Sequence, residues 1–184
     1  MVKDGAYVQA YNAQVVVDGA RQIILAHGVS SQPPDQEYLV PMVERLIAFS
    51  GQAPKALLAD SGYFSADGVH GLQDRHLESY IAVGREGTQT QPAASRLTPA
   101  ETQRTQMREK LNSTAGKTAY SRRKVIVEPV FGQIEQARGF RRFSQRGLAK
   151  VRREWALVCL AHNLLKLFRY RLMQELPSLT CCMG

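Results

Sequence analysis

Residues 55–83 read KALLADSGYFSADGVHGLQDRHLESYIAV, and this stretch decides the fold class. Residues 55–59 form a short apolar run typical of a buried strand that ends at Asp60, and residues 78–83 predict a second strand. Ser65 can start a helix between the two strands. A strand, a helix and a strand within this length form a βαβ unit, whose two strands are parallel. We therefore expect an α/β fold.

The residues before this unit predict a hairpin and a helix. Residues 7–17 and 21–29 are rich in β-forming residues, and the Asp18-Gly19 pair between them is typical of a tight hairpin turn. Apolar residues at helical spacing over positions 39–47 predict the helix, which Asp35 can cap.

Three helices are predicted after the βαβ unit. Thr98-Pro-Ala-Glu101 combines an N-cap threonine, a proline at the first helical position and a capping-box glutamate, so the first helix should begin there. The apolar residues after Val125 predict the second, which should begin or be kinked near Pro129 because proline removes a helical hydrogen bond. Residues 148–175 predict the third, and its apolar segment 157–168 indicates a central buried helix.

The charge of the chain is unevenly distributed. The net charge is +8, but residues 1–92 carry 6 Lys+Arg against 10 Asp+Glu, whereas residues 93–184 carry 18 against 6. A basic half of this kind indicates contact with nucleic acid, with a solvated basic surface as the alternative. The cysteines lack zinc-ligand spacing, no apolar stretch could span a bilayer and no signal-peptide pattern begins the chain, so we expect a cytoplasmic protein without a membrane partner. Cys159 and His162 are expected to be core residues.

Two isolated carboxylates are candidates for chemistry. Asp60 follows a predicted strand, and ligands of open α/β sheets gather beyond the carboxyl ends of strands. Glu128 lies in the apolar run Val-Ile-Val-Glu-Pro, where an acid costs desolvation energy unless a metal or cation compensates it. Together they could hold a divalent metal for phosphoryl transfer. The alternatives are a turn or cap role for Asp60 and a salt bridge from Glu128 to Arg123 or Lys124.

A basic stretch follows the glutamate. Residues 138–147 read RGFRRFSQRG and interleave arginines with phenylalanines, and Lys150 comes soon after. Arginine binds phosphate in bidentate fashion, while the aromatic rings could stack on bases or anchor the loop. This pattern favours contact with DNA phosphates over a merely solvated loop.

Taken together, several segments resemble the DDE-type transposases of bacterial insertion sequences. The matching stretches are Tyr11-Asn-Ala-Gln14, Leu58-Ala-Asp-Ser-Gly-Tyr63, Tyr120-Ser-Arg-Arg-Lys-Val-Ile-Val-Glu-Pro-Val-Phe-Gly-Gln-Ile134 and His162-Asn-Leu-Leu-Lys166. The resemblance covers almost the whole chain. It implies an RNase H-like fold, in which a mixed sheet is flanked by helices.

The resemblance also implies a site. In this family three carboxylates bind two divalent metals, usually Mg²⁺, with Mn²⁺ as the substitute; Asp60 matches the second carboxylate and Glu128 the third. The implied partner is DNA at the ends of the insertion sequence, and the intact enzyme would cut and join DNA strands. The residues expected to bind DNA, from the signature or from the basic stretch, are Tyr120, Arg123, Lys124, Arg138, Arg141, Arg142, Arg146 and Lys150.

Two positions depart from the family pattern. Glu135 stands where the signature has a lysine. No residue matches the first catalytic aspartate, which in the family lies on a strand before the Tyr-Asn-Ala-Gln segment. The nearby acids are Asp4, Asp18 and Asp35, but Asp18 lies in a predicted tight turn and Asp35 resembles a helix cap. We therefore expect residues 1–184 to form one partial DDE domain that lacks its first strand and is inactive, or nearly so, alone. Its expected parts are the hairpin and βαβ part (1–83), a loop and capped helix (84–119) and a basic helical part with the glutamate (120–176).

Two rival functions stay open from the sequence. One is a non-catalytic DNA-binding protein that regulates or inhibits transposition, and the other is a degenerate remnant that barely folds. A homo-oligomer, or pairing with full-length transposase, is also possible, because an exposed sheet edge favours pairing with another chain.

Overall fold

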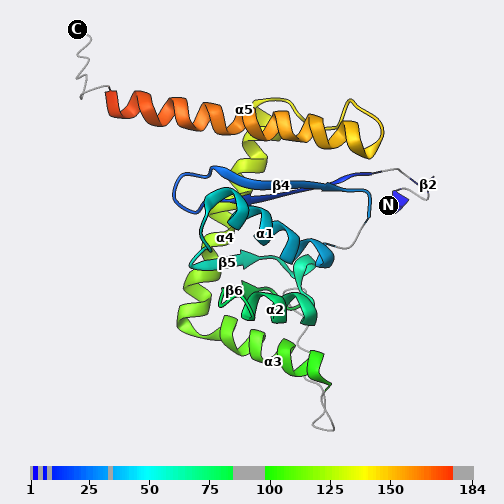
Figure 1. Cartoon of the computed structure of the whole chain (residues 1–184), viewed down its shortest axis with the longest axis vertical. Helices are drawn as coiled ribbons and strands as arrows, with labels where there is room; N and C mark the ends of the chain where they lie inside the picture. Colours follow the sequence, from blue (N-terminus) through cyan, green and yellow to red (C-terminus); the bar gives the residue numbers. More distant parts are fainter. Residues whose placement is uncertain (1, 4–5, 8–9, 33–34, 85–97, 176–184) are drawn as a thin grey trace.

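The computed structural model describes residues 2–3, 6–7, 10–32, 35–84 and 98–175. Most of the loop expected at the start of the 84–119 part therefore lies outside the described residues, as does Asp4. Within these residues the predicted α/β fold is confirmed, with five α-helices and three two-stranded sheets (Figure 1). The pairs are β1 (Val2–Lys3) with β2 (Ala6–Tyr7), β3 (Asn12–Val17) with β4 (Ile24–Ser30), and β5 (Ala56–Ala59) with β6 (Glu78–Ile81).

The strands do not form the single mixed sheet that was predicted. β3 and β4 are antiparallel, whereas β5 and β6 are parallel, so both kinds of pairing are present. Among the described residues, however, β3 pairs only with β4 and β5 pairs only with β6. The two pairs therefore remain separate sheets, held together by helices rather than by backbone hydrogen bonds.

The predicted hairpin is confirmed, but residues 18–23 form a longer connection than the tight turn expected at Asp18-Gly19, and the two strands begin later than expected, at Asn12 and Ile24. The register places Asn12 opposite Ser30 and Val15 opposite His27. Asp18 closes the turn, because its Oδ2 accepts hydrogen bonds from the backbone N–H of Ala20 at 3.1 Å and of Arg21 at 2.7 Å. The turn signal therefore comes from the side chain of Asp18, which bonds the backbone of the residues that follow it.

The predicted βαβ unit is also confirmed. β5 is followed by the short helix η2 (Ser61–Tyr63), by α2 (Ala66–Gln73) and by β6, which pairs with β5 in parallel. Ser65 caps α2, since its side chain accepts from Gly68 N–H at 3.0 Å.

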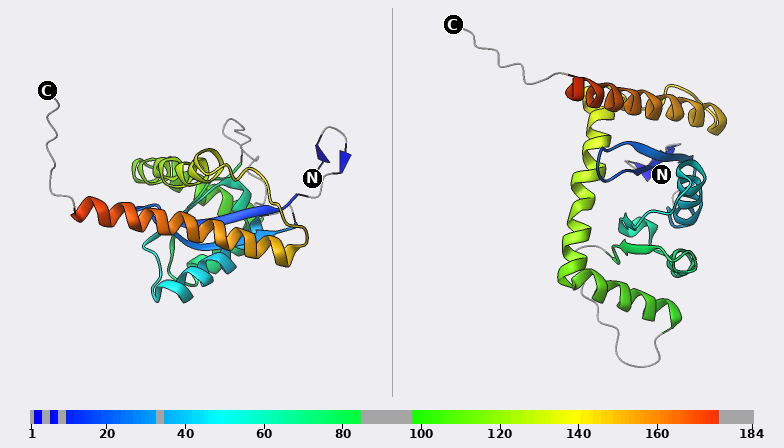
Figure 2. Two further views of the ribbon diagram at one scale, coloured as in Figure 1. Left: turned by 90° about the horizontal axis from the view of Figure 1, so that it is seen from above. Right: turned by 60° about the vertical axis from the view of Figure 1, so that its left-hand side comes forward.

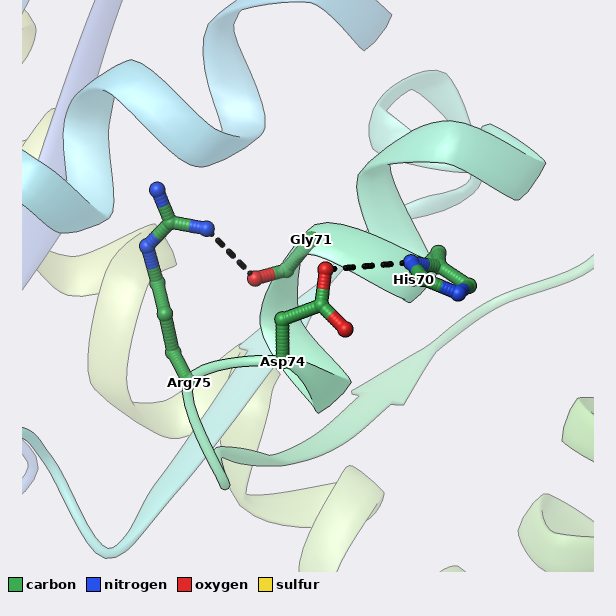
Figure 3. Close-up of polar contacts among 4 residues, drawn as sticks. All are labelled: His70, Gly71, Asp74 and Arg75. Carbon is green, nitrogen blue, oxygen red and sulfur yellow. Dashed lines mark hydrogen bonds and ion pairs between the residues drawn. The ribbon is translucent and has the colours of Figure 1, made fainter.

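Polar contacts close the C-terminal end of α2. Arg75 Nη1 donates to the Gly71 carbonyl at 2.7 Å, and His70 Nδ1 lies 3.1 Å from Asp74 Oδ2 (Figure 3). Arg75 also pairs with Glu44 of α1 (Leu39–Ser50), which fixes α2 against that helix.

Helices α1 and α4 (Thr114–Gly132) connect the two sheets. α1 packs Met42 and Leu46 with Ala26 of β4, and it packs Leu39 and Val43 into the core that contains β5 and β6. Figure 2 shows α4 running beside both sheets on the side away from α1. The sheets therefore occupy one layer between these two helices.

The start of α1 differs from the prediction for Asp35. A short helix η1 (Gln36–Tyr38) comes first, and Asp35 at its N-cap makes no side-chain capping bond. At the end of α1, Gly51 takes a left-handed φ of 72° and donates to the Ile47 carbonyl at 2.8 Å. The carboxylate of Asp35 is used elsewhere, as described below.

Helix α3 (Pro99–Asn112) has the predicted capping box. The Thr98 backbone N–H donates to Glu101 Oε2 at 2.7 Å, and Glu101 N–H donates to Thr98 Oγ1 at 3.3 Å. These reciprocal bonds satisfy two of the free N–H groups at the helix start.

The predicted start of the next helix is wrong. α4 begins at Thr114, capped by Ser113, and it contains Pro129 in its interior. A proline there cannot donate to the carbonyl four residues earlier, which belongs to Val125. Gln22 supplies the missing donor, because its Nε2 lies 3.0 Å from the Val125 oxygen. A residue of the hairpin therefore allows the helix to continue, into a π-helical turn η3 (Gln133–Ala137).

Helix α5 (Leu148–Glu175) has the predicted bounds but not the predicted place. It is not central; it lies across β4 at the outside of the molecule (Figure 1). One side buries Val151, Trp155, Cys159 and His162. The opposite side exposes more than half the surface of five large apolar residues, which are Leu157, Leu160, Leu164, Leu167 and Phe168. An all-round apolar pattern cannot specify which side of a helix the rest of the chain covers.

The predicted roles of Cys159 and His162 are confirmed. Cys159 is a buried free cysteine. His162 is fully buried, with Nε2 2.9 Å from the Gln22 carbonyl oxygen and Nδ1 3.1 Å from Arg138 Nη1. None of the helices in the described part of the chain is long and apolar enough to cross a membrane.

Candidate functional site

Asp60 lies at the carboxyl end of β5, where a site was expected. It is also the N-cap of η2, and its Oδ1 accepts from Gly62 N–H at 3.0 Å. Its side chain is half-exposed, with a fractional exposure of 49%. The capping role that was the simple alternative is therefore present, and it uses Oδ1 and not Oδ2.

Arg123 of α4 is the nearest cation to Asp60. Its Nη1 lies 3.9 Å from Asp60 Oδ2, and its guanidinium lies over the ring of Tyr120, 5.7 Å from the centroid. The Arg123 side chain is only 20% exposed, and its buried Nε has no hydrogen-bond partner among the described residues. Arg123, which was expected to contact DNA phosphate, therefore also compensates the charge of Asp60.

Asp35 is a carboxylate that the sequence analysis assigned to the wrong role. Its Oδ1 accepts hydrogen bonds from Asn12 Nδ2 and from Gln14 Nε2, the latter at 2.8 Å. A Cβ atom added to Gly62 would lie 3.1 Å from Asp35 Oδ2 and 3.2 Å from Asp60 Oδ1. The two carboxylates therefore flank Gly62, close to each other.

Tyr63 reports the electrostatics of this pair. Burial raises the pKa of Tyr63 well above its usual range, and the charges of Asp35 and Asp60 raise that pKa further. The sequence carried a signal for the role of Asp35, since the Tyr-Asn-Ala-Gln segment places the amides of Asn12 and Gln14 two residues apart, on the same side of β3. We call Asp35, Asp60 and Arg123 the carboxylate site.

Glu128 is not part of the carboxylate site. It is exposed, and no described residue forms an ion pair with it, so neither the expected burial nor a salt bridge to Arg123 or Lys124 is present. Five positions along an α-helix turn a side chain by about 140° around the axis. α4 therefore directs Arg123, and not Glu128, at Asp60.

The described residues do not fit the metal centre that the resemblance implies. DDE transposase domains generally use divalent metals. Among residues 10–32, 35–84 and 98–172, no group of three or more His, Cys, Asp or Glu side chains lies close enough to hold a metal ion. No chemical step is therefore assigned to a metal in this chain.

The basic stretch 138–147 is a defined loop, which we call the basic loop. Glu154 of α5 holds it by accepting from Ser144 N–H at 2.9 Å, Ser144 Oγ at 2.6 Å and Gln145 N–H at 3.0 Å. Burial alone would raise the pKa of Glu154, but the hydrogen bonds together outweigh it, so the pKa lies below its ordinary value. Gly147 donates to the Tyr11 hydroxyl at 3.0 Å, which fixes the loop to the start of β3.

The aromatic residues of the basic loop anchor it to the core. Phe140 and Phe143 lie edge to face at 5.3 Å between ring centroids, and each lies 6.1 Å from Trp155. Tyr11 meets Phe143 edge to face at 6.0 Å. Of the two roles that the sequence left open, anchoring is therefore present in the structure.

The predicted DNA-binding residues fall into two groups. Five are exposed cations, on α4, on the basic loop and at the start of α5: Lys124, Arg141, Arg142, Arg146 and Lys150. Tyr120, Arg123 and Arg138 are only half-exposed. Arg138 donates to the buried His162, and its pKa is lowered by burial and then by Arg169, so part of its role is structural.

A cavity of about 540 Å³ opens beside the basic loop. We call it the aromatic pocket; its walls include Tyr11, Phe131, Phe140, Phe143 and Trp155, and Glu135 and three arginines also line it. Glu135, the residue that departs from the family signature, is thus a wall residue of this pocket. Sequence reasoning missed this because Tyr11 and Glu135 are far apart in the chain.

One comparison with known proteins supports the resemblance. The family model described as a transposase DDE domain matches residues 85–168. The resemblance to DDE-type transposases is thereby confirmed for this segment, which takes in Glu128, the basic loop and most of α5 but not Asp60. No curated protein and no solved structure matches the chain.

Proposed function

We propose that this chain binds DNA as part of a DDE-type transposase. The observation that carries the proposal is the basic loop, whose exposed Arg141, Arg142 and Arg146 are presented on a framework held by Glu154 and the aromatic rings. The loop lies inside the segment that matches the transposase DDE domain. Because the loop backbone is held, only the exposed arginine side chains have to be ordered when they bind phosphate oxygens.

The finer parts of the proposal follow from the resemblance. The fold is RNase H-like, residues 1–184 form one partial DDE domain, and the DNA is an insertion-sequence end in the cytoplasm. Tyr120 and Arg123 would meet phosphates near the cut. The parallel β5–β6 pair between α1 and α4 supports the fold assignment, because it provides the strand end that carries Asp60.

Catalysis requires more than the described residues bring together. Asp60 and Glu128 are the proposed catalytic carboxylates of a complete site that uses Mg²⁺ or Mn²⁺, and this chain alone is proposed to be inactive. The contact between Asp60 and Arg123 supports inactivity, because a paired carboxylate is a weaker metal ligand than a free one. Because α4 turns Glu128 away from Asp60, pairing with full-length transposase, or with another copy, would have to add the remaining ligand and also bring Glu128 to Asp60.

Salt-dependent binding to duplex DNA tests the DNA-binding proposal. We expect log K to fall linearly with log salt concentration, with a slope of about −0.9 per phosphate contact. The double variant Arg141→Gln/Arg142→Gln should weaken binding and reduce the slope by about 2. Lys55→Gln/Lys117→Gln removes the same charge at two exposed positions away from the basic loop and is the matched control. Equal losses of DNA affinity in both double variants would mean that binding depends on the total charge of the chain and not on the basic loop.

A non-catalytic regulator of transposition is the second candidate, and the Asp60–Arg123 contact favours it. A DNA-cleavage assay with Mg²⁺ and Mn²⁺ separates the two. We expect no cleavage by the wild-type chain alone. If the wild type cleaves DNA and both Asp60→Ala and Glu128→Ala abolish the cleavage, the chain has an active site and the regulator hypothesis is wrong.

A further inference from the structure

The aromatic pocket combines two kinds of surface in one cavity. Tyr11, Phe131, Phe140 and Phe143 are only half-buried, whereas Trp155 behind them is 2% exposed. The front rings therefore leave apolar surface uncovered after they have packed against one another. A cavity of about 540 Å³ has the size of the pockets that hold small organic ligands in proteins.

The charges around the pocket restrict what can enter. Arg141, Arg142 and Arg146 are exposed and line it, so an anionic ligand is favoured. Glu135 lines the same cavity and is also exposed. A carboxylate would repel a bare inorganic anion that came close, so the anionic part of the ligand must stay with the arginines while a hydrogen-bond donor faces Glu135.

A nucleotide has these properties in one molecule. Its phosphates suit the arginines, and its planar base suits a wall of aromatic rings. A glutamate accepts hydrogen bonds from exocyclic amino groups, which cytosine and adenine carry and thymine lacks. We propose that the aromatic pocket binds a single unpaired nucleobase of the DNA, with a preference for a base that bears an exocyclic amino group. This inference rests on the proposed DNA-binding function.

The base has to be unpaired because of its surroundings in a duplex. A base inside the helix is covered on both faces by stacking, and its Watson–Crick edge is occupied by its partner. Only a base that has left the stack can offer a face to Phe140 or Phe143 and an edge to Glu135. Glu135, which stands at the signature lysine position, would then bind the edge of the base and would not have to face a phosphate.

The experiment uses Trp155 as the reporter, since it is the chain's single tryptophan and lies in the pocket wall. The probes are single-stranded oligonucleotides of dC, dA or dT and an abasic oligonucleotide with the same number of phosphates. We expect dC and dA to quench Trp155 fluorescence and to bind roughly 5- to 150-fold more tightly than the abasic strand, which is the range that stacking of one base supplies. Oligo-dT should bind less tightly than dC or dA.

Glu135→Gln tests the base preference without disturbing the fold, because Glu135 is exposed. A glutamine can both donate and accept, so this variant should lose most of the discrimination against dT. Glu109→Gln removes the same charge from an exposed position on α3 and is the control, so it should retain the discrimination against dT. Unchanged discrimination in Glu135→Gln would overturn the role of Glu135.

The failures of the two proposals can be told apart. Salt-dependent binding of equal strength to abasic and normal strands, with unchanged Trp155 fluorescence, would overturn the pocket proposal and leave DNA binding standing. Absence of binding to every strand and to duplex DNA would overturn both.

Discussion

Helix α4 joins two regions that differ in how they are built. Near its middle, Arg123 faces Asp60 in the carboxylate site, which is half-exposed and held by polar contacts. At its C-terminal end, Phe131 contributes to the aromatic pocket, where rings pack on the buried Trp155. One region depends on charges near solvent, and the other depends on apolar packing.

This difference separates binding from catalysis. The aromatic pocket and the basic loop are complete within the described residues, because packing and Glu154 fix their geometry. The carboxylate site has two acids around Gly62 and a compensating arginine, but no third ligand among the described residues. The chain should therefore behave as a stable DNA-binding unit whether or not it can cut DNA.

The largest expected effect is on the packed region. Trp155→Ala removes the ring that Phe131, Phe140 and Phe143 share, and should lower the free energy of unfolding by about 3–5 kcal/mol. Urea denaturation followed by circular dichroism measures the loss. Leu157→Ala, on the exposed side of the same helix, is the control and should change stability by less than about 0.5 kcal/mol. A loss in Trp155→Ala as small as in the control would mean that the aromatic cluster is not a core.

Glu154→Gln tests the electrostatic part of the same region. Removing a charged acceptor of three hydrogen bonds should cost about 1–3 kcal/mol near neutral pH. The pKa of Glu154 is lower in the folded chain than its ordinary value of 4.5, so its stabilisation is present above that pH. That stabilisation is lost as the pH falls through the folded-state pKa.

The pH dependence is measured as the difference in unfolding free energy between wild type and Glu154→Gln. This difference should be constant above about pH 5 and shrink at lower pH. Glu128→Gln changes an exposed acid that forms no ion pair with the described residues; it is the control and should change stability by less than about 0.5 kcal/mol. A difference that stays constant down to pH 3 would contradict the assignment to Glu154.

The sequence predicted local structure well where one residue determines it. The Asp18 turn, the Ser65 cap and the Thr98 capping box each depend on a side chain bonding to its own neighbours. The position of Asp60 at a strand end was also predicted from local sequence, because a short apolar run ends there.

The predictions from sequence were wrong where a residue far away in the chain determines the local structure. Helix α4 passes through Pro129 because Gln22, from the hairpin, bonds the carbonyl that proline leaves free. Asp35 was interpreted as a helix cap, yet Asn12 and Gln14 of β3 hold its carboxylate near Asp60. Neither contact follows from helical or strand periodicity, because each joins segments that only the tertiary fold brings together.

The Gln22 contact provides a third test, since it links the hairpin to the helix that spans both regions. Gln22→Asn keeps an amide and tolerates the left-handed φ of 59° but is too short to reach Val125, so it should cost about 1 kcal/mol. Gln22 Oε1 also accepts from Lys166 Nζ at 2.7 Å, and this bond is affected in either background. In a Pro129→Ala background the helix regains its own donor, so the part of the cost that belongs to Val125 should disappear. A double-mutant cycle by urea denaturation measures the coupling. Equal costs in both backgrounds would show that Gln22 does not compensate the proline.

The smallest effect is expected at the carboxylate site. Asp60→Asn keeps an oxygen that can accept from Gly62 N–H but removes the charge that faces Arg123. Because the carboxylate is half-exposed and lies 3.9 Å from its partner, stability should change by less than about 0.5 kcal/mol. DNA should bind more tightly, since Arg123 is released and one repelling charge is removed. A loss above about 2 kcal/mol in urea denaturation would mean that the carboxylate site is held as firmly as the aromatic pocket, and the distinction between the two regions would fail.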